Sequence, residues 1–247
     1  MIPPHFYCPE LARTQKDIPL FDKEELHHLI HVLRAKPGDP VTIFSGKGLK
    51  ALGVITAATN KEVRVALHSF SEDALPQPLL VLACAIPKRS KFEIIIEKCT
   101  ELGVDEIIPL RTTRTLISHS QKAFEGKHKR FAEVALNACK QCQRAFLPKV
   151  HPITDFQNAL SMLTPDDIGL IGSLGNDQKR LSDLSQEQLR TCRKVFCLIG
   201  PEGDFTSEEL KLSLSKGFIP VTLGPNILKV DTAASSIISY LMLTLRS

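Results

Sequence analysis

Two glycine-containing loops near the end of the chain combine residue types that could hold a small ligand. They are residues 200–204, with the sequence GPEGD, and residues 224–226, with the sequence GPN, and each follows a predicted strand. In open α/β sheets, ligands bind beyond the carboxyl ends of the strands, where loops lead into helices. Glycine also lets the backbone approach a ligand closely. The loops are a candidate binding site, although two ordinary turns explain them equally well.

The charges in these loops narrow the kind of ligand that they could hold. Glu202 and Asp204 would repel a phosphate group, and the chain has no G-x-x-x-x-G-K-[ST] sequence and no G-x-G-x-x-G after the first strand. A cationic or neutral ligand suits the two carboxylates better, because opposite charges attract. The sulfonium group of S-adenosylmethionine is such a cation, so this cofactor is a candidate.

The strands that would position these loops are predicted from apolar runs. Residues 79–85, 169–174 and 194–199 are typical of strands buried on both faces of a parallel sheet. Residues 106–110 and 221–223 predict two more strands. Because helices are predicted between them, the order favours an α/β fold with a parallel sheet of about five or six strands.

Capping sequences and apolar spacing place the helices. Ser90 with Glu93, and Thr206 with Glu209, have the spacing of a capping box, which predicts that helices begin there. Asp231 is a candidate N-cap for a final helix from residue 232. One helix face is predicted from apolar residues at helical spacing, namely Phe131, Val134, Ala135, Ala138 and Cys142.

Residues 1–72 predict a separate, β-rich domain. A short helix over 23–33 is followed by predicted strands at 41–44, 51–56 and 62–67. Residues 73–78 contain two prolines and are predicted as a linker, so residues 79–247 form the second predicted domain.

The net charge is small but unevenly distributed. The 247 residues carry 31 Lys and Arg against 27 Asp and Glu, and this balance of +4 is too weak to indicate a nucleic-acid partner. Residues 85–150 hold 13 basic against 7 acidic groups, a balance of +6, whereas residues 151–247 sum to −2. The basic region is either a solvated helical face or a surface for an anionic partner.

Composition and targeting signals exclude several classes of protein. An apolar fraction of 43% can build a core and excludes a disordered chain. The sequence has no secretory signal and no apolar segment long enough to span a bilayer, which predicts a cytoplasmic protein with no membrane partner. The seven cysteines lie mostly among apolar residues and predict reduced, buried thiols.

Two motifs could bind a metal but lack a full ligand set. Cys139 and Cys142 have the C-x-x-C spacing without a second pair at a matching distance, so two helix cysteines are the preferred interpretation. His27 and His31, with His28 beside them, lie one helical turn apart, but no carboxylate or Cys completes a site. Packing or contact between domains is the preferred role for these histidines, and no metal is predicted.

The order of motifs along the chain resembles a known family. Residues 198–203, 223–229 and 231–233 resemble the closing motifs of the SPOUT methyltransferases, and more narrowly the bacterial 16S rRNA uridine N3-methyltransferases of the RsmE type. Further similar segments, in chain order, are 31–34 with 36–39, 88–91 with 100–104, and 140–144 with Pro148. The resemblance spans nearly the whole chain.

This resemblance implies a fold, a cofactor and partners. It implies a small PUA-like β-barrel that binds RNA, followed by a parallel-sheet domain whose last segment threads a loop to form a trefoil knot. It also implies a homodimer, S-adenosylmethionine as the cofactor, and 16S rRNA of the small ribosomal subunit as the substrate. Methylation of uridine N3 needs an unpaired base, removal of the N3 proton, and alignment with the sulfonium methyl group.

Site residues follow from the same resemblance. Asp231 or Glu202 would lie near the sulfonium or accept the proton, and Lys229 or Arg144 would stabilise negative charge on the uracil ring. A simple helix N-cap is the alternative role for Asp231, and orientation of the turn is the alternative for Glu202. Cofactor contacts are expected from Leu174, Leu198, Ile199, Gly200, Gly203, Leu223, Gly224, Ile227, Leu228, Thr232 and Ala233. RNA contacts are expected from Arg34, Lys88, Arg89, Lys91, Arg111, Arg114, Gln141 and Arg144.

Three positions depart from the family pattern. Asp204 stands where the family usually has Gly, Lys229 where it has Arg, and Asp231 where it has Glu. Lys keeps the charge of Arg but loses its planar fork of donors.

Gln141 could read a base edge or pack as a buried amide. Two other functions stay open: a SPOUT enzyme that acts on another RNA or on ribose 2′-O, and a non-catalytic RNA-binding factor of ribosome assembly.

Overall fold

The computed structural model describes residues 3–20, 26, 29–30, 34–59, 61–87, 92–115, 121–174 and 177–246. Their contacts divide the chain into two compact units, Met1–Leu75 with Cys139–Leu147, and Pro76–Ala138 with Pro148–Ser247. The segment Cys139–Leu147 thus belongs with the N-terminal residues, whereas the sequence division places it in the second domain. Most of the predicted helix over 23–33, with His27, His28 and His31, lies outside the described residues.

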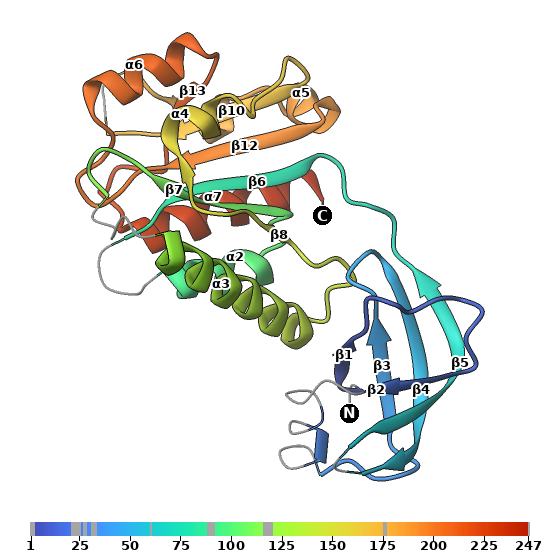
Figure 1. The fold of residues 1–247 in the computed structure, drawn as a ribbon. Coiled ribbons are helices and arrows are strands. Elements are labelled where there is room, and N and C mark those ends of the chain that lie inside the picture. The colour runs from blue at the N-terminus through green and yellow to red at the C-terminus, as the bar shows by residue number, and fades with distance from the viewer. Residues whose placement is uncertain are drawn as a thin grey trace. The chain divides into compact units, whose positions relative to one another are not determined.

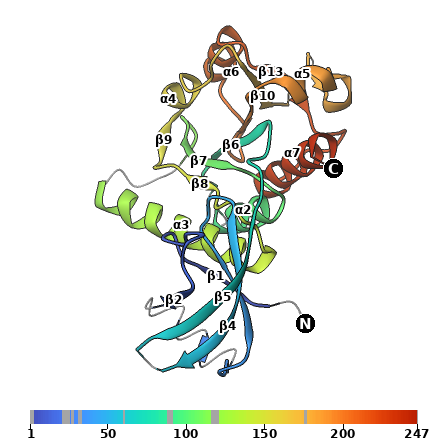
Figure 2. The same cartoon turned by 90° about the vertical axis from the view of Figure 1, so that its right-hand side faces the viewer.

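The first unit is built on a curled five-stranded sheet, a half-barrel (Figures 1 and 2). The three strands predicted in this region are confirmed, and the last one continues to Glu72, beyond its predicted end. The sheet has the order β1-β3-β4-β5-β2, with β1 (His5–Tyr7), β2 (Asp17–Leu20), β3 (Pro40–Phe44), β4 (Leu49–Ala58) and β5 (Val63–Glu72). Val63 and Val65 are buried while Arg64 is exposed, which explains the alternating pattern of β5.

A glycine turn between β3 and β4 explains why Cys139–Leu147 belongs to this unit. Gly46 and Gly48 have φ angles of 74° and 102°, which glycine adopts without strain. The Gly48 N–H donates to the Ala145 carbonyl at 3.1 Å, and the Leu147 N–H donates to the Gly46 carbonyl at 2.9 Å. These backbone bonds join segments far apart in the sequence, so no local pattern could predict them.

The second unit is a parallel sheet of eight strands with helices on both faces (Figure 1). The strand order is β11-β13-β10-β12-β6-β7-β8, and β9 also pairs with β7. The strands are β6 (Leu79–Ala85), β7 (Glu106–Arg111), β8 (Lys149–Val150), β9 (Thr154–Asp155), β10 (Asp167–Gly172), β11 (Lys179–Arg180), β12 (Lys194–Ile199) and β13 (Ile219–Thr222). The predicted α/β class is confirmed. The predicted number of strands was too low, because two-residue strands carry no apolar period.

Two layers of helices cover this sheet. One layer contains α2 (Phe92–Glu101), α3 (Gln121–Cys142), η2 (Leu181–Asp183), α5 (Gln186–Thr191) and α7 (Val230–Leu245), and the other contains α4 (Phe156–Leu160) and α6 (Ser207–Ser215). Alternate residues of β6 serve both layers, because Leu80 and Leu82 pack with the first while Val81 and Ala83 pack with the second. Burial on both faces explains why β6 is apolar throughout.

The two helix starts near the candidate site differ in how well the sequence predicts them. The capping box at Thr206 is confirmed, since its Oγ1 accepts from the Glu209 N–H at 3.2 Å and the Glu209 carboxylate accepts from the Thr206 N–H at 2.9 Å. The prediction of Asp231 as an N-cap is wrong. Lys229 occupies that position, and the Ala233 N–H donates to the Lys229 carbonyl at 2.8 Å, so Asp231 lies in the first turn. Ser90 of the other predicted capping box lies outside the described residues.

The cysteines are free thiols, as predicted. Five are buried, namely Cys8, Cys84, Cys99, Cys139 and Cys197, and burial raises the pKa of Cys99 and of Cys139 to about 12. Within the described ranges, no group of His, Cys, Asp and Glu side chains could hold a metal ion. None of the described helices is both long and apolar enough to cross a membrane.

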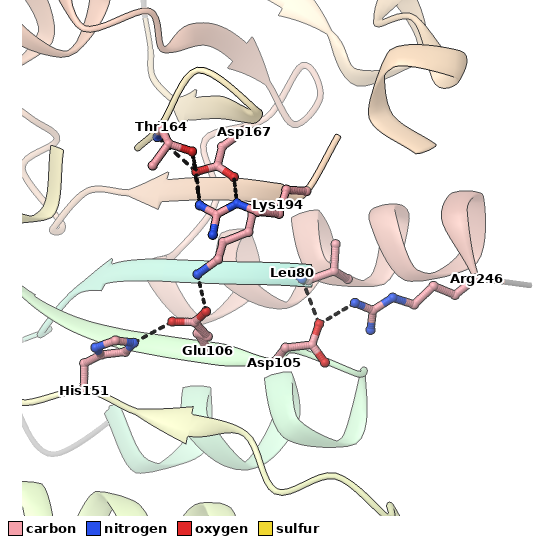
Figure 3. Close-up of polar contacts among 9 residues, drawn as sticks. Leu80, Asp105, Glu106, His151, Thr164, Asp167, Lys194 and Arg246 are labelled. Carbon is pink, nitrogen blue, oxygen red and sulfur yellow. Dashed lines mark hydrogen bonds and ion pairs between the residues drawn. The ribbon is translucent and has the colours of Figure 1, made fainter. Parts of the chain in front are cut away.

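Charged side chains gather at the amino ends of the parallel strands (Figure 3). Glu106, at the start of β7, accepts from His151 Nε2 at 2.7 Å and pairs with Lys194 Nζ at the start of β12 at 2.5 Å. Hydrogen bonds from His151 and Lys194 outweigh the opposing effect of burial and lower the pKa of Glu106 to about 2.

Two further carboxylates lie at these amino ends of the strands, which we refer to as the amino edge of the sheet. Asp105 accepts from the Leu80 N–H at 2.8 Å and pairs with Arg246, which follows α7 (Figure 3). The Asp167 side chain is fully buried, pairs with Arg193 at 3.0 Å, and accepts from the Thr164 hydroxyl at 2.7 Å. We refer to this set as the amino-edge network, which consists of Asp105, Glu106, His151, Thr164, Asp167, Arg193, Lys194 and Arg246.

Candidate active site

A pocket of about 290 Å³ lies at the other end of the strands, at the carboxyl ends of β10, β12 and β13. We refer to this end of the parallel strands as the carboxyl edge of the sheet. Since these three parallel strands are neighbours, the loops that follow them converge there. The pocket is lined by Gly172, Ser173, Leu174, Ile199, Gly200, Pro201, Glu202, Asp204, Val221, Thr222, Leu223, Gly224, Asn226, Ile227, Leu228, Lys229, Val230 and Ala233. Its position is the one where open α/β sheets bind ligands.

Two large apolar side chains of the pocket are exposed. Leu174, which follows β10, is 60% exposed, and Ile227, between β13 and α7, is 81% exposed. Removing apolar surface from water is favourable, so both side chains would stabilise an apolar part of a ligand that covered them. The pocket is therefore suited to a ligand with an apolar portion.

The main chain contributes to one wall of the pocket at Gly224. Its φ angle of 129° is one that residues with side chains rarely adopt. The Thr222 hydroxyl donates to the Gly224 carbonyl at 3.0 Å and lies 3.3 Å from the Gly224 N–H. These contacts fix the turn after β13. Because Gly224 has no side chain, a ligand can approach the backbone of this turn closely.

The pocket holds three charged side chains among its described residues, Glu202, Asp204 and Lys229. Glu202 and Lys229 are exposed. Burial, with smaller contributions from the charges of Cys99, Asp231 and Glu202, raises the pKa of the Cys84 thiol near the end of β6. The charges of Asp231 and Glu202 therefore both act at the carboxyl end of β6.

The turn 112–115, which follows β7, holds the loop after β12. The Arg114 guanidinium donates to the Gly203 carbonyl and lies 3.5 Å from the carbonyl oxygens of Asp204 and Phe205. The turn is itself anchored by the buried Glu209 carboxylate, which accepts from the Thr113 N–H at 2.8 Å and the Thr113 hydroxyl at 3.0 Å. Arg114 thus connects the turn to the backbone of a pocket loop.

Most residues predicted to contact a cofactor lie together at the pocket. Those that line it are Leu174, Ile199, Gly200, Leu223, Gly224, Ile227, Leu228 and Ala233. Leu198 is instead buried in the core beneath α4 and α6, Gly203 lies against the Arg114 side chain, and Thr232 is exposed in the first turn of α7. The pocket is also lined by residues outside the list of expected cofactor contacts, namely Gly172, Ser173, Pro201, Asp204, Val221, Thr222, Asn226 and Val230. The ends of the predicted strands were the available signal for several of these.

The predicted catalytic residues divide between the two compact units. Glu202 and Lys229 line the pocket, and the Lys229 ammonium has no hydrogen-bond or ion-pair partner among the described residues. Asp231 lies in the first turn of α7 and does not line the pocket. Arg144 belongs to the first unit. The roles given to all four stay predictions.

The residues predicted to bind RNA have varied surroundings. Lys88, Arg89 and Lys91 lie outside the described residues. Arg111 pairs with Asp155, and Arg114 donates to the Gly203 carbonyl in the loop after β12. In the first unit, Arg34 and Gln141 are exposed, so the alternative of a buried amide at Gln141 does not hold, and Arg144 is half-buried.

Comparison with known proteins defines the class to which this fold and pocket belong. A protein-family model described as an RNA methyltransferase domain matches residues 74–242. A second family model, described as an RNA methyltransferase PUA domain, matches residues 21–67. The molecule is therefore an RNA methyltransferase with a PUA domain.

Individual relatives narrow this class to a family. A Synechocystis protein named ribosomal RNA small subunit methyltransferase E is 35% identical over 90% of this chain and 72% of its own length. A Bacillus subtilis protein of the same name is 29% identical over 95% of each chain. A crystal structure of the Neisseria gonorrhoeae enzyme of that name, bound to S-adenosyl methionine, has a TM-score of 0.89 at 26% identity and covers 99% of this chain and 98% of its own. The chain belongs to the ribosomal RNA small subunit methyltransferase E family, which confirms the resemblance found in the sequence.

Proposed function

We propose that this protein transfers a methyl group from S-adenosylmethionine to N3 of a specific uridine in 16S rRNA. The observation that carries the proposal is the pocket at the carboxyl edge of the sheet, found in a chain of the ribosomal RNA small subunit methyltransferase E family. The pocket supplies the cofactor site, and the family supplies the class of substrate.

The residues of the pocket suit S-adenosylmethionine. Leu174 and Ile227 offer apolar surface to the adenosine, and the turn at Gly224 lets the main chain approach it. Glu202 and Asp204 disfavour a phosphate-bearing cofactor, and the Glu202 carboxylate suits a sulfonium cation. When bound, the cofactor supplies an electrophilic methyl group.

Residues of the chain must then deal with the proton and the charge of the uracil ring. In this proposal Glu202 or Asp231 accepts the N3 proton, and Lys229 or Arg144 stabilises the negative charge that forms. Lys229 has the strongest support, because it lines the pocket and its ammonium has no partner among the described residues. Orienting the base against the methyl group contributes further, since oriented reactants gain roughly 7–11 kcal/mol.

The RNA is the proposed partner of both domains. Residues 1–72 would form an RNA-binding domain, joined by residues 73–78 to a methyltransferase domain over 79–247. The match to a PUA domain and the +6 balance of residues 85–150 support this division. The protein would act as a homodimer on the small ribosomal subunit in the cytoplasm, where ribosomes assemble.

Mass spectrometry of 16S rRNA nucleosides from cells with and without the gene tests the proposal. We expect 3-methyluridine to disappear on deletion and to return when the wild-type gene is restored. Unchanged 3-methyluridine would end the proposal, and loss of a 2′-O-methylated nucleoside instead would move the reaction to the ribose.

A Lys229→Ala variant tests the assignment of the charge-stabilising group. We expect methylation of small subunits at saturating cofactor to slow by about 10²-fold, because one charge-stabilising group is lost at the reacting ring. Lys211→Ala, which removes an exposed cation on α6, is the matched control. A Lys229→Ala enzyme that methylates at the wild-type rate would remove Lys229 from the scheme.

A further inference from the structure

Asp204 has an uncommon backbone conformation for a residue with a side chain. Its φ angle is 60°, and among the described non-glycine residues only Arg34 and Gln143 share a positive φ. Asp tolerates this left-handed region better than most residues, but Gly adopts it without strain. An Asp at this position therefore points to a role for its carboxylate.

Both carboxylate oxygens of Asp204 accept backbone hydrogen bonds. Oδ1 accepts from the Phe205 N–H at 2.8 Å, and Oδ2 accepts from the Leu174 N–H at 3.2 Å. Leu174 follows β10 and Asp204 follows β12, and these two strands are hydrogen-bonded neighbours. One carboxylate thus joins two of the loops that line the pocket.

The same carboxylate occupies the space beside Gly200. A Cβ added to Gly200 would lie 3.2 Å from Asp204 Oδ1 and 3.2 Å from the Phe205 ring. Leu174, Gly200 and Asp204 all line the pocket. The Asp204 side chain therefore fixes the shape of the loop after β12 and also its connection to the exposed Leu174.

We propose that Asp204 is a positioning residue, whose carboxylate holds the loops after β10 and β12 of this chain at the separation at which its pocket binds S-adenosylmethionine. It acts through the backbone of Leu174 and Phe205 and takes no part in proton transfer. This inference rests on the proposed function, because it concerns the same pocket. Loss of the carboxylate releases the main chain at Leu174, and this weakens binding of the adenosine that the cofactor shares with its demethylated product, S-adenosylhomocysteine.

Calorimetric titration of the full-length protein with each of these two compounds tests the inference. Asp204→Gly keeps the backbone conformation but removes both acceptors, so affinity for both compounds should fall by about tenfold. Asp204→Asn keeps a single acceptor oxygen and should lose about threefold for both. Asp166→Asn, which removes an exposed carboxylate just before β10, is the matched control and should bind like the wild type.

Amide hydrogen exchange supplies a readout that a general loss of folding would not reproduce. In Asp204→Gly, exchange at the Leu174 N–H should speed up, while exchange at the Leu80 N–H, which donates to Asp105, should stay as in the wild type. Wild-type affinity in Asp204→Gly, or a loss confined to the sulfonium compound with unchanged exchange at Leu174, would overturn the positioning role. A wild-type protein that binds neither compound would overturn the proposed function itself, and this inference with it.

Discussion

The two edges of the parallel sheet differ in how their side chains find partners. At the amino edge, Glu106 and Asp105 each accept from a cation and from a second donor, and their side chains are 12% and 9% exposed. At the carboxyl edge, the Lys229 ammonium has no partner among the described residues, and Leu174 and Ile227 expose apolar surface. Buried polar groups cost free energy unless they are paired. The contrast indicates that the amino edge stabilises the fold, while Lys229, Leu174 and Ile227 at the carboxyl edge are available to a ligand.

The largest effect on stability is expected from Arg246→Ala. The guanidinium pairs with Asp105 and donates to the Gly103 carbonyl at 2.9 Å, and the Arg246 and Asp105 side chains are 12% and 9% exposed. Removing one partner of a buried ion pair leaves an uncompensated charge, so the free energy of unfolding should fall by about 3–5 kcal/mol.

Urea unfolding measures this effect against a matched control. Arg180→Ala removes an exposed arginine that pairs with Asp183, where the two side chains are 78% and 47% exposed. Its expected cost is about 0–1 kcal/mol. Equal losses for Arg246→Ala and Arg180→Ala would contradict the stabilising role of the amino edge.

The pH dependence of stability is expected to depend on Glu106. Its pKa of about 2 lies below its ordinary value of 4.5, so the unfolded chain takes up this proton more readily than the folded chain. The stabilisation is fully present above about pH 4.5 and is lost as the pH falls toward 2, and it amounts to about 3 kcal/mol.

Glu106→Gln tests this expectation in unfolding measurements between pH 2 and 7. The variant should be less stable at neutral pH and should lose part of the acid dependence seen in the wild type. Glu187→Gln, at an exposed position on α5, should keep the wild-type curve. A Glu106→Gln protein that follows the wild-type acid dependence would show that this carboxylate is not the group responsible.

At the carboxyl edge, Ile227→Ala should change binding and leave stability unaltered. Because Ile227 is 81% exposed, its loss removes little buried surface from the folded chain. Covering the side chain with the cofactor would contribute about 1–2 kcal/mol, so affinity should fall by about five- to thirty-fold. Leu214→Ala, which is 42% exposed on α6 and outside the pocket, should bind the cofactor normally. A destabilised Ile227→Ala protein with full affinity would reverse the assignment.

Arg114→Ala should have the smallest effect, and it separates two roles for this residue. Its guanidinium donates to the Gly203 carbonyl, so cofactor affinity measured without RNA should fall by about 1 kcal/mol, roughly fivefold. Lys211→Ala is the control for loss of a positive charge. If Arg114→Ala bound the cofactor like the wild type and lowered only the salt dependence of RNA binding, by a slope of about 1, Arg114 would contact phosphate and not the loop.

The sequence predicts the long strands of the second unit better than its short ones. The strands 79–85 and 194–199 match β6 and β12 in both bounds, because burial on both faces makes such runs apolar without a break. The strands β8, β9 and β11 span two residues each and carry no such pattern. Long-range pairing was also out of reach, as the backbone bonds of Gly46 and Gly48 to residues 145 and 147 illustrate.

The candidate site was predicted in outline, while its internal contacts were not. Loops after predicted strands indicated the pocket, and the family resemblance supplied most residues that line it. The role of Asp204 depends on a positive φ and on a contact with Leu174, thirty residues earlier, and neither leaves a local signal. Asp231 was placed wrongly because an acidic residue suits both an N-cap and the first turn of a helix.

The most direct test of the division between the two edges is amide hydrogen exchange with and without S-adenosylmethionine, measured on the full-length protein. We expect the cofactor to slow exchange in the loops 172–174, 199–205 and 222–233, which line or support the pocket. Exchange at the Leu80 N–H of the amino edge should be unchanged. Slower exchange confined to the amino edge, or no change anywhere at saturating cofactor, would contradict this division between a stabilising edge and a binding edge.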